Sequence, residues 1–271
     1  MPKWLVKNGL VLKSGNKALL DAAPDTPLLW TPAEISTTAW YDASDAITIN
    51  EDDAPGFVSQ WDDKSGNANH LIQGFGANQP AYGARQINGI NILDFTPALQ
   101  YMNMTTTIAP TGEVHMFAVV EVDALSDQIL FGNGGGTKLG MWTVNNTWGF
   151  RWSNLAGGVT FSSPAGLNIG AGSPGIWRFY REASNQTYAQ KNAELTPYSS
   201  GLYSAAGNPQ LNRISFNNAQ GFDGKVAEVI IVNRVMTIDE IDRIHGYLAW
   251  KWGTESSLPI GHPYKNSPPE V

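Results

Sequence analysis

Between residues 30 and 253 the chain consists of short runs rich in β-branched and aromatic residues, separated at short intervals by Gly, Asn, Pro and Ser. Several runs alternate apolar and polar residues, as a strand with one buried face does. Regular short strands with turn residues between them predict an all-β, antiparallel sandwich. Strands and helices do not alternate, so a parallel sheet is not expected. Examples of these runs are Ile90–Phe95, Val114–Val122, Trp148–Trp152 and Val226–Val232.

One helix is expected near the C-terminus. Thr237 and Glu240 have the spacing of a capping box, in which the threonine hydroxyl caps the helix and the glutamate reaches back. Apolar residues then recur at helical spacing, and Gly253 follows in the usual terminating position. Asp239, Glu240 and Asp242 are therefore interpreted as acids that favourably meet the helix dipole, and not as a catalytic acid/base pair.

Residues 1–29 form a short N-terminal β-hairpin arm, separate from the domain of residues 30–271. Its apolar runs are divided by turn residues, and a stretch with two prolines links it to the rest. Strands this short bury little apolar surface alone, so we expect the arm to attach to another chain or to oligomerise. The alternative is a hairpin folded back on its own domain. The residues expected in this contact are Trp4, Leu5, Val6, Leu10, Leu12 and Leu19.

The composition of the chain excludes several classes of binding partner. The net charge is −7, without a basic run, which argues against binding of nucleic acid. The chain has no Cys, which excludes disulfides and cysteine-ligated zinc. No apolar run approaches the ~20 residues of a membrane span, and the N-terminus lacks the apolar core of a signal peptide. We expect no membrane partner and a protein assembled in a host cytoplasm.

Several segments together resemble the laminin-G-like, concanavalin A-like jelly-roll superfamily, in the form common in bacteriophage and environmental bacterial proteins. The resemblance covers about residues 36–268 and implies two facing antiparallel sheets in a jelly roll. Such domains bind carbohydrate, mediate protein contacts or form structural shells, so their function has to be argued from the site. The matching segments are Trp40–Asp45, Trp61–His70, Asn88–Phe95, Gly224–Ile231, Tyr247–Gly253 and Leu258–Tyr264.

The loop Trp61–Leu71 concentrates acids and turn-forming residues. The resemblance implies that Asp63 lies in a tight turn, in some relatives near a structural calcium. Calcium takes six to eight oxygen ligands, which Asp63, Asn67, Asn69 and backbone carbonyls could partly supply. The alternative is an Asx turn, in which the carboxylate accepts backbone N–H groups. Many relatives carry an Asp-Glu pair where this chain has Ala227-Glu228, so one potential ligand is missing.

A group of aromatic and amide side chains predicts a carbohydrate site. Sugar rings stack on indole, and their hydroxyls pair with amides. Trp148, Phe150 and Trp152 share one face of their strand, because side chains repeat with period two. The alternative is that these rings fill the core between the sheets. The predicted carbohydrate-binding residues are Trp142, Asn145, Asn146, Trp148 and Trp152.

Signatures of catalysis are weak. His70, His115, His245 and His262 show no metal-ligand spacing, and His115 lies within an apolar strand, which favours a structural role. Glycoside hydrolases use paired carboxylates, and Glu121-Val122-Asp123 is the nearest such pattern but lacks a third acid. No Ser-His-Asp signature occurs. We therefore expect no enzymatic activity.

These observations favour a non-enzymatic bacteriophage virion protein, such as a capsid decoration, head fibre or tail-associated subunit. The jelly roll would be exposed on the particle surface, with the arm contacting other virion proteins or a second copy. A homotrimer is expected by analogy with phage fibres, and host or environmental glycans are expected ligands. The alternatives are a carbohydrate-binding module of a bacterial protein and, with least support, a glycoside hydrolase or lyase.

Overall fold

The computed structural model describes residues 4–7, 10–13, 28–51, 55–96, 99–124, 128–133, 138–144, 147–154, 157–160, 171–202, 210–216 and 221–271. For residues 4–13, 138–160 and 198–202 it describes the path of the strands. The chain divides into two compact units, Met1–Leu29 with Glu270–Val271, and Trp30–Pro269. In the described part, no helix is both long enough and apolar enough to cross a membrane.

The first unit contains a two-stranded hairpin of β1 (Trp4–Lys7) and β2 (Leu10–Lys13). The strands are antiparallel, with Leu5 opposite Leu12. The predicted arm hairpin is thus present, whereas Leu19 lies outside the described residues. Leu29 forms an isolated antiparallel bridge with Glu270, and the Val271 amide donates to the Leu28 carbonyl at 2.9 Å.

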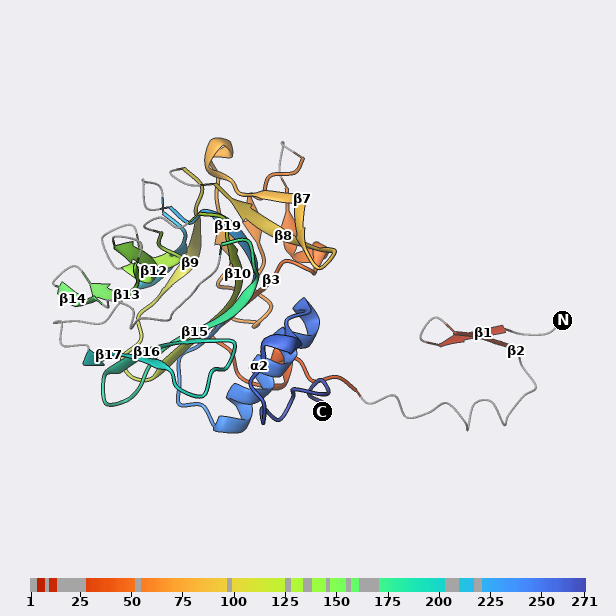
Figure 1. The fold of residues 1–271 in the computed structure, drawn as a ribbon. Helices are drawn as coiled ribbons and strands as arrows, with labels where there is room; N and C mark the ends of the chain where they lie inside the picture. The colour runs from red at the N-terminus through yellow and green to blue at the C-terminus, as the bar shows by residue number, and fades with distance from the viewer. Residues whose placement is uncertain are drawn as a thin grey trace. The chain divides into compact units, whose positions relative to one another are not determined.

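The second unit is built from strands and one long helix (Figure 1). Its strands are β3 (Ala39–Asp42), β4 (Ile49–Asn50), β5 (Gln60–Trp61), β6 (Leu71–Ile72), β7 (Ala81–Ile87), β8 (Ile90–Phe95), β9 (Met102–Ile108), β10 (Val114–Val122), β11 (Phe131–Gly132), β12 (Lys138–Val144), β13 (Thr147–Asn154), β14 (Gly157–Thr160), β15 (Gly175–Arg181), β16 (Gln186–Lys191), β17 (Tyr198–Leu202), β18 (Leu211–Ile214) and β19 (Gly224–Val232). Its helices are η1 (Pro32–Glu34), η2 (Ala46–Thr48), η3 (Gly76–Asn78), α2 (Ile238–Trp252) and η4 (Glu255–Ser257).

The strands form two sheets. One is eight-stranded in the order β17-β16-β15-β10-β19-β8-β7, with β3 also paired to β19. The other is nine-stranded in the order β14-β13-β12-β11-β18-β9-β6-β5-β4. Every pairing between these named strands is antiparallel. The predicted all-β antiparallel sandwich with one C-terminal helix is therefore confirmed.

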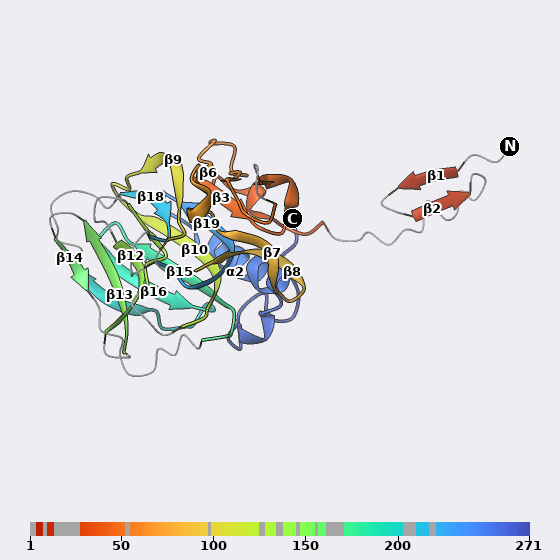
Figure 2. The same ribbon diagram turned by 90° about the horizontal axis from the view of Figure 1, so that it is seen from above.

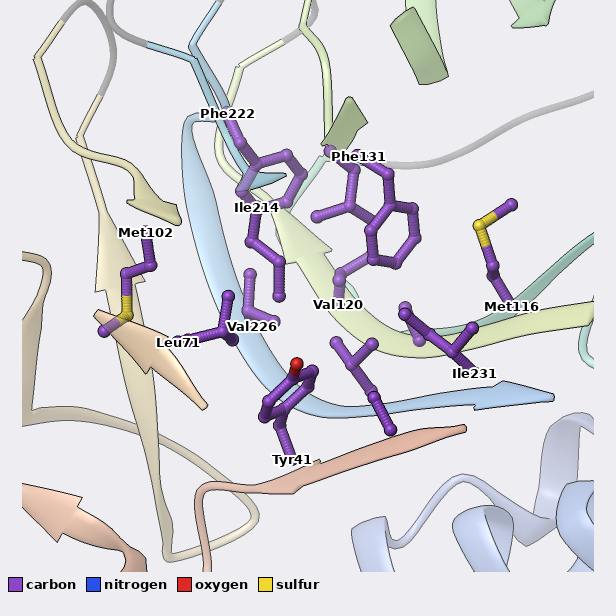
Figure 3. Close-up of a cluster of buried hydrophobic side chains, with 14 of the residues drawn as sticks. Tyr41, Leu71, Met102, Met116, Val120, Phe131, Ile214, Phe222, Val226 and Ile231 are labelled. Atoms are coloured by element: carbon purple, nitrogen blue, oxygen red, sulfur yellow. The ribbon is translucent and has the colours of Figure 1, made fainter. Parts of the chain in front are cut away.

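The main core lies between the two sheets (Figure 3). Tyr41, Val120 and Val226 contribute from the eight-stranded sheet, and Leu71 and Ile214 contribute from the nine-stranded sheet. All five are fully or almost fully buried. Removing this apolar surface from water is the main force that holds the sheets together.

A second core lies on the opposite face of the eight-stranded sheet, under α2 (Figure 2). The apolar side of α2 packs there against residues such as Phe117 and Ile230. This explains why every residue of β10 is buried, since both of its faces are covered. Thr237 and Glu240 form the expected capping box, and Gly253 ends α2 with a left-handed φ of 67°. The helix predicted from its capping signals is therefore present.

The tail after α2 is held by specific contacts. The Lys265 Nζ donates to the carbonyls of Glu255, Ser256 and Leu258 at 3.2, 2.7 and 2.8 Å. The indole of Trp250 donates to the carbonyl of Tyr264 at 2.8 Å. The tail thus has a defined path along α2, and this path brings His262 to the helix.

Candidate functional site

The outer face of the nine-stranded sheet carries one continuous row of paired residues. The inner row next to it includes Leu71, Phe131 and Ile214, which belong to the core between the sheets. Since side chains alternate across a strand, the residues that precede or follow these face outward. Directly paired across successive strands on the outer row are Asn50, Gln60, Ile72, Asn103, Arg213 and Gly132. We call this row the open face.

The open face carries three amides and the cation Arg213. None of its six positions is a carboxylate, but Asp62 lies next to the row, and its Oδ1 accepts from Gln60 Nε2 at 2.6 Å. From Asn50 to Gly132 the row crosses five strand spacings, or about 24 Å. Whereas α2 covers the other sheet, Asn50 is exposed and Gln60 and Asn103 are half-buried. The row therefore offers hydrogen-bonding groups along a rigid, accessible line.

Arg213 is the fixed centre of this row. Its Nε donates to Asn103 Oδ1 at 2.8 Å, and its guanidinium carbon lies 4.2 Å from the centre of the Tyr101 ring. Burial lowers the pKa of Arg213, while the nearby Tyr101 opposes that shift. An arginine remains protonated under ordinary conditions despite such a shift. The open face therefore holds a positive charge oriented by an amide and an aromatic ring.

Exposed apolar side chains lie within the row, at Ile72, and in the segments next to Tyr101. Ile72, Phe75 and Leu99 are 39%, 64% and 57% exposed. The segments that carry them are tied together, because Gln73 Nε2 donates to the Tyr101 carbonyl at 2.9 Å and the Tyr101 amide donates to the Asn78 carbonyl at 3.2 Å. Apolar and aromatic surface beside amides is the combination that binds the C–H faces and hydroxyls of a sugar.

The predicted tryptophan site is divided by the strand register. Trp152 is paired with Leu139, which is paired with Phe131 of the inner row. Trp148 and Trp152 are thus at inner-row positions, while Trp142, opposite Gly149, is at an outer-row position. Asn145 and Asn146 lie outside the described residues, as do the side chains of the three tryptophans. The assignment of these five residues to carbohydrate binding stays a prediction.

The Asp63 carboxylate is saturated with hydrogen-bond donors. Its Oδ1 accepts from the amides of Trp40 and Ser65 at 2.8 and 2.9 Å. Its Oδ2 accepts from the Ser65 hydroxyl at 2.7 Å and the Asn69 amide at 3.0 Å. The side-chain nitrogens of Asn67 and Asn69 donate to the Thr38 carbonyl at 3.2 and 2.8 Å. These bonds have the form of the Asx-turn alternative, and calcium binding at Asp63, Asn67 and Asn69 stays a prediction.

A buried ionic network lies close to this loop. Glu228 is fully buried on β19. Its carboxylate accepts from the indoles of Trp40 and Trp252, each at 2.7 Å, and from the Tyr247 hydroxyl at 2.9 Å. Lys251 Nζ lies 2.7 Å from Glu228 and 2.6 Å from Asp42.

The groups around Glu228 stabilise its ionised form. Burial raises the pKa of Glu228, and Lys251 opposes that shift. All the groups around its two oxygens are donors, so an ionised carboxylate is the form that satisfies them. The glutamate of the Ala227-Glu228 pair is thus part of the link between β3, β19 and α2.

The two acids of the Glu121-Val122-Asp123 pattern each form ion pairs with cations. Glu121 lies 2.7 Å from Lys225 Nζ, and Asp123 forms a two-pronged ion pair with Arg85. Arg85 also contacts Asp94 at 2.9 Å. Hydrogen bonding to Arg85 lowers the pKa of Asp123, whereas burial raises the pKa of Asp94. The cluster lies on the eight-stranded sheet and not on the open face.

Comparisons with known proteins support the fold. No family model and no curated protein sequence matches the chain. A Trypanosoma rangeli sialidase in complex with sialic acid is similar in structure, with 13% identity, a TM-score of 0.51, and 92% of this chain and 42% of the sialidase covered. Domain 4 of an extracellular GH43 arabinanase from Geobacillus stearothermophilus, in complex with arabinotriose, has 13% identity, a TM-score of 0.47, and 76% and 96% coverage.

These likenesses define a class of fold and not an activity. The chain is an all-β sandwich, and its likeness to the sialidase extends to the fold alone. It spans less than half of the sialidase. The expectation that the chain is not an enzyme is contradicted, because the structures that share its fold include a glycoside hydrolase. That expectation rested on the absence of catalytic motifs from any one stretch of sequence. In this fold, residues of one site can come from strands that are far apart in the sequence. The comparisons show no link to bacteriophage.

The open face was not foreseen from the sequence. Gln60, Asn103 and Arg213 are each ordinary polar residues in short strands, and no spacing along the chain relates them. The only local signal was strand alternation, which indicates that Asn103 points away from Met102 and Met104. Their assembly into one row depends on the pairing of β5, β6, β9 and β18, which lie far apart in the sequence.

Proposed function

We propose that this protein binds a glycan chain on the open face. The observation that carries the proposal is the continuous outer row of amides with Arg213 at its centre, next to exposed apolar side chains. The likeness to a sialidase bound to sialic acid is consistent with a carbohydrate ligand. A row of about 24 Å suits an extended oligosaccharide better than a single sugar.

The parts of the face have separate roles in this proposal. Gln60 Nε2 donates to Asp62 Oδ1 at 2.6 Å and Asn103 Oδ1 accepts from Arg213, so Gln60 Oε1 is left to accept from sugar hydroxyls and Asn103 Nδ2 to donate to them. Arg213 donates to ring or carboxylate oxygens from a position fixed by Asn103 and Tyr101. Phe75 supplies a ring face for stacking. Since the groups stand on paired strands, little side-chain ordering opposes binding.

A glycan array with acidic and neutral oligosaccharides, followed by calorimetry on the best ligand, tests the proposal. Asn103→Ala and Phe75→Ala should each weaken binding about tenfold, which corresponds to about 1.4 kcal/mol. The matched control is Leu195→Ala, which also removes an exposed apolar side chain. Leu195 lies in the connection between β16 and β17 of the eight-stranded sheet, and not on the open face. Binding that is lost equally in the control, or unchanged in both face variants, would count against the open face.

Attachment to a virion is a finer part of the proposal. It is supported by the separate compact unit that contains the β1–β2 hairpin, and by its apolar residues such as Trp4 and Leu12. In this arrangement the arm contacts other virion proteins or further copies of the chain. The sandwich is then displayed on the particle with its open face toward host or environmental glycans.

A further inference from the structure

Two histidines and an aspartate meet where the tail crosses α2. Asp242 and His245 are three residues apart on α2, which places them on the same side of the helix. His262 comes from the tail. Each residue offers one ligand atom such that all three atoms lie within 4.8 Å of one another. The two imidazole rings are 6.3 Å apart at nearly a right angle.

His245 has no partner for either ring nitrogen. Its side chain is 1% exposed, and neither Nδ1 nor Nε2 has a hydrogen bond. Burial, and then the charge of Arg178, lowers the pKa of His245, and the Ile241 backbone opposes that shift. Leaving a buried polar group without a hydrogen-bond partner destabilises the folded protein. A buried imidazole with both ring nitrogens unpaired has a lone pair available to a metal ion.

His262 completes the cluster from the opposite side. Its side chain is 5% exposed, and its Nε2 lies 3.7 Å from Asp242 Oδ1, too far for a hydrogen bond. The Asp242 side chain is 26% exposed, so water reaches the cluster from this side. Two imidazoles, one carboxylate and a water are a common ligand set for zinc.

We propose that Asp242, His245 and His262 bind a divalent transition metal ion, with zinc as the fitting ion and water as the fourth ligand. In a tetrahedral zinc site the ligand atoms are about 3.3 Å apart, so the widest separation has to close by about 1.5 Å. The side chain of Asp242 and the tail segment with His262 make this movement. The site joins α2 to the tail.

Metal binding by His262 breaks one hydrogen bond of the tail. His262 Nδ1 accepts from the Tyr264 amide at 3.2 Å. When Nε2 binds the metal, the neutral ring carries its proton on Nδ1, and this bond is lost. The turn of residues 262–264 therefore shifts on binding. The free energy of one long hydrogen bond is small beside that of zinc binding to a protein site.

The test is zinc binding to the full chain. Wild type should bind one Zn²⁺ in calorimetry, and Co²⁺ in its place should show the visible absorption of a four-coordinate site. His262→Gln and Asp242→Asn should weaken binding at least tenfold. The control is His70→Gln, which removes a histidine outside the cluster. The chain has four histidines and no cysteine, so few other strong ligands compete.

The outcomes are separable from misfolding. Without metal, Asp242→Asn should melt near the wild-type temperature, and His262→Gln should melt lower because it loses the bond from the Tyr264 amide, so the deciding readout is the change in melting temperature on adding zinc. Zinc should raise the melting temperature of wild type and of His70→Gln only. Wild type that binds no Zn²⁺, or binding that survives loss of both His262 and Asp242, would overturn the proposal. Binding lost in His70→Gln would place the ion elsewhere and overturn it as well.

Discussion

At the scale of single residues, Glu228 shows how a buried charge can be held. Glu228→Gln should lower the free energy of unfolding by about 3–5 kcal/mol, because it removes the buried negative charge beside Lys251 and turns an amide N–H toward one of the two indole donors. Urea denaturation measures the change. Asp239→Asn is the matched control: it breaks an exposed helix ion pair with Arg243 and should cost no more than about 0.5 kcal/mol. Equal losses would show that the network adds nothing to an ordinary surface pair.

The surroundings of His115 lead us to expect that the stability of the protein depends on pH. It lies between Glu113 and Arg178, at 2.8 and 2.9 Å. Burial, and then the charge of Arg178, lowers the pKa of His115 from 6.5 to about 4. Between these values the unfolded chain binds a proton that the folded chain does not, so stability falls as the pH drops through this range.

The size of this effect can be measured with one variant. From pH 7.5 to pH 5, His115 should account for a loss of about 2 kcal/mol. His115→Gln keeps an acceptor and a donor but cannot titrate, so its loss over the same range should be smaller by that amount. Other buried groups titrate equally in both proteins and cancel in the difference. Parallel pH profiles would mean that His115 is not held neutral.

At the scale of elements, predictability follows the distance over which a signal acts. The capping box of α2 involves residues three apart, so the sequence is sufficient to place its start. The inward and outward alternation of β9 is equally local. The row from Gln60 to Arg213 is not, because it depends on which strands are neighbours and in which register. A shift of one residue in a strand would turn its whole set of side chains over.

Gly246 of α2 shows the same contrast. Helix propensity favours Gly→Ala by about 1 kcal/mol. Here a Cβ at position 246 would lie 2.6 Å from the Cβ of Tyr264. Gly246→Ala should therefore destabilise the protein and loosen the tail, measured by denaturation and by hydrogen exchange of residues 259–269. Adding Tyr264→Gly removes the clashing atoms, so Gly246→Ala should be less harmful in that background. An additive double mutant would show that the contact does not set the cost.

At the scale of the whole molecule, the two compact units differ in how much hydrophobic core stabilises them. Trp30–Pro269 contains both hydrophobic cores, whereas the β1–β2 hairpin has two four-residue strands. A two-stranded hairpin is marginal alone. The sequence indicated this division because the break in composition near residue 27 is local. What the arm contacts could not be predicted, because its partner is not encoded in the turn pattern.

Removal of the arm tests its proposed role. A chain of residues 28–271 should keep the melting temperature of the full chain within a few degrees, since it retains both cores and the bond between Val271 and Leu28. Light scattering after size exclusion should show an oligomer for the full chain and a monomer for the shortened one. Trp4→Ser with Leu12→Ser in the full chain should reproduce the monomer, because polar side chains weaken an apolar contact without shortening the arm. Glycan binding per subunit should be unchanged in all three, because the open face lies within Trp30–Pro269. A monomeric full chain would refute self-association through the arm and leave attachment to a different protein as its role.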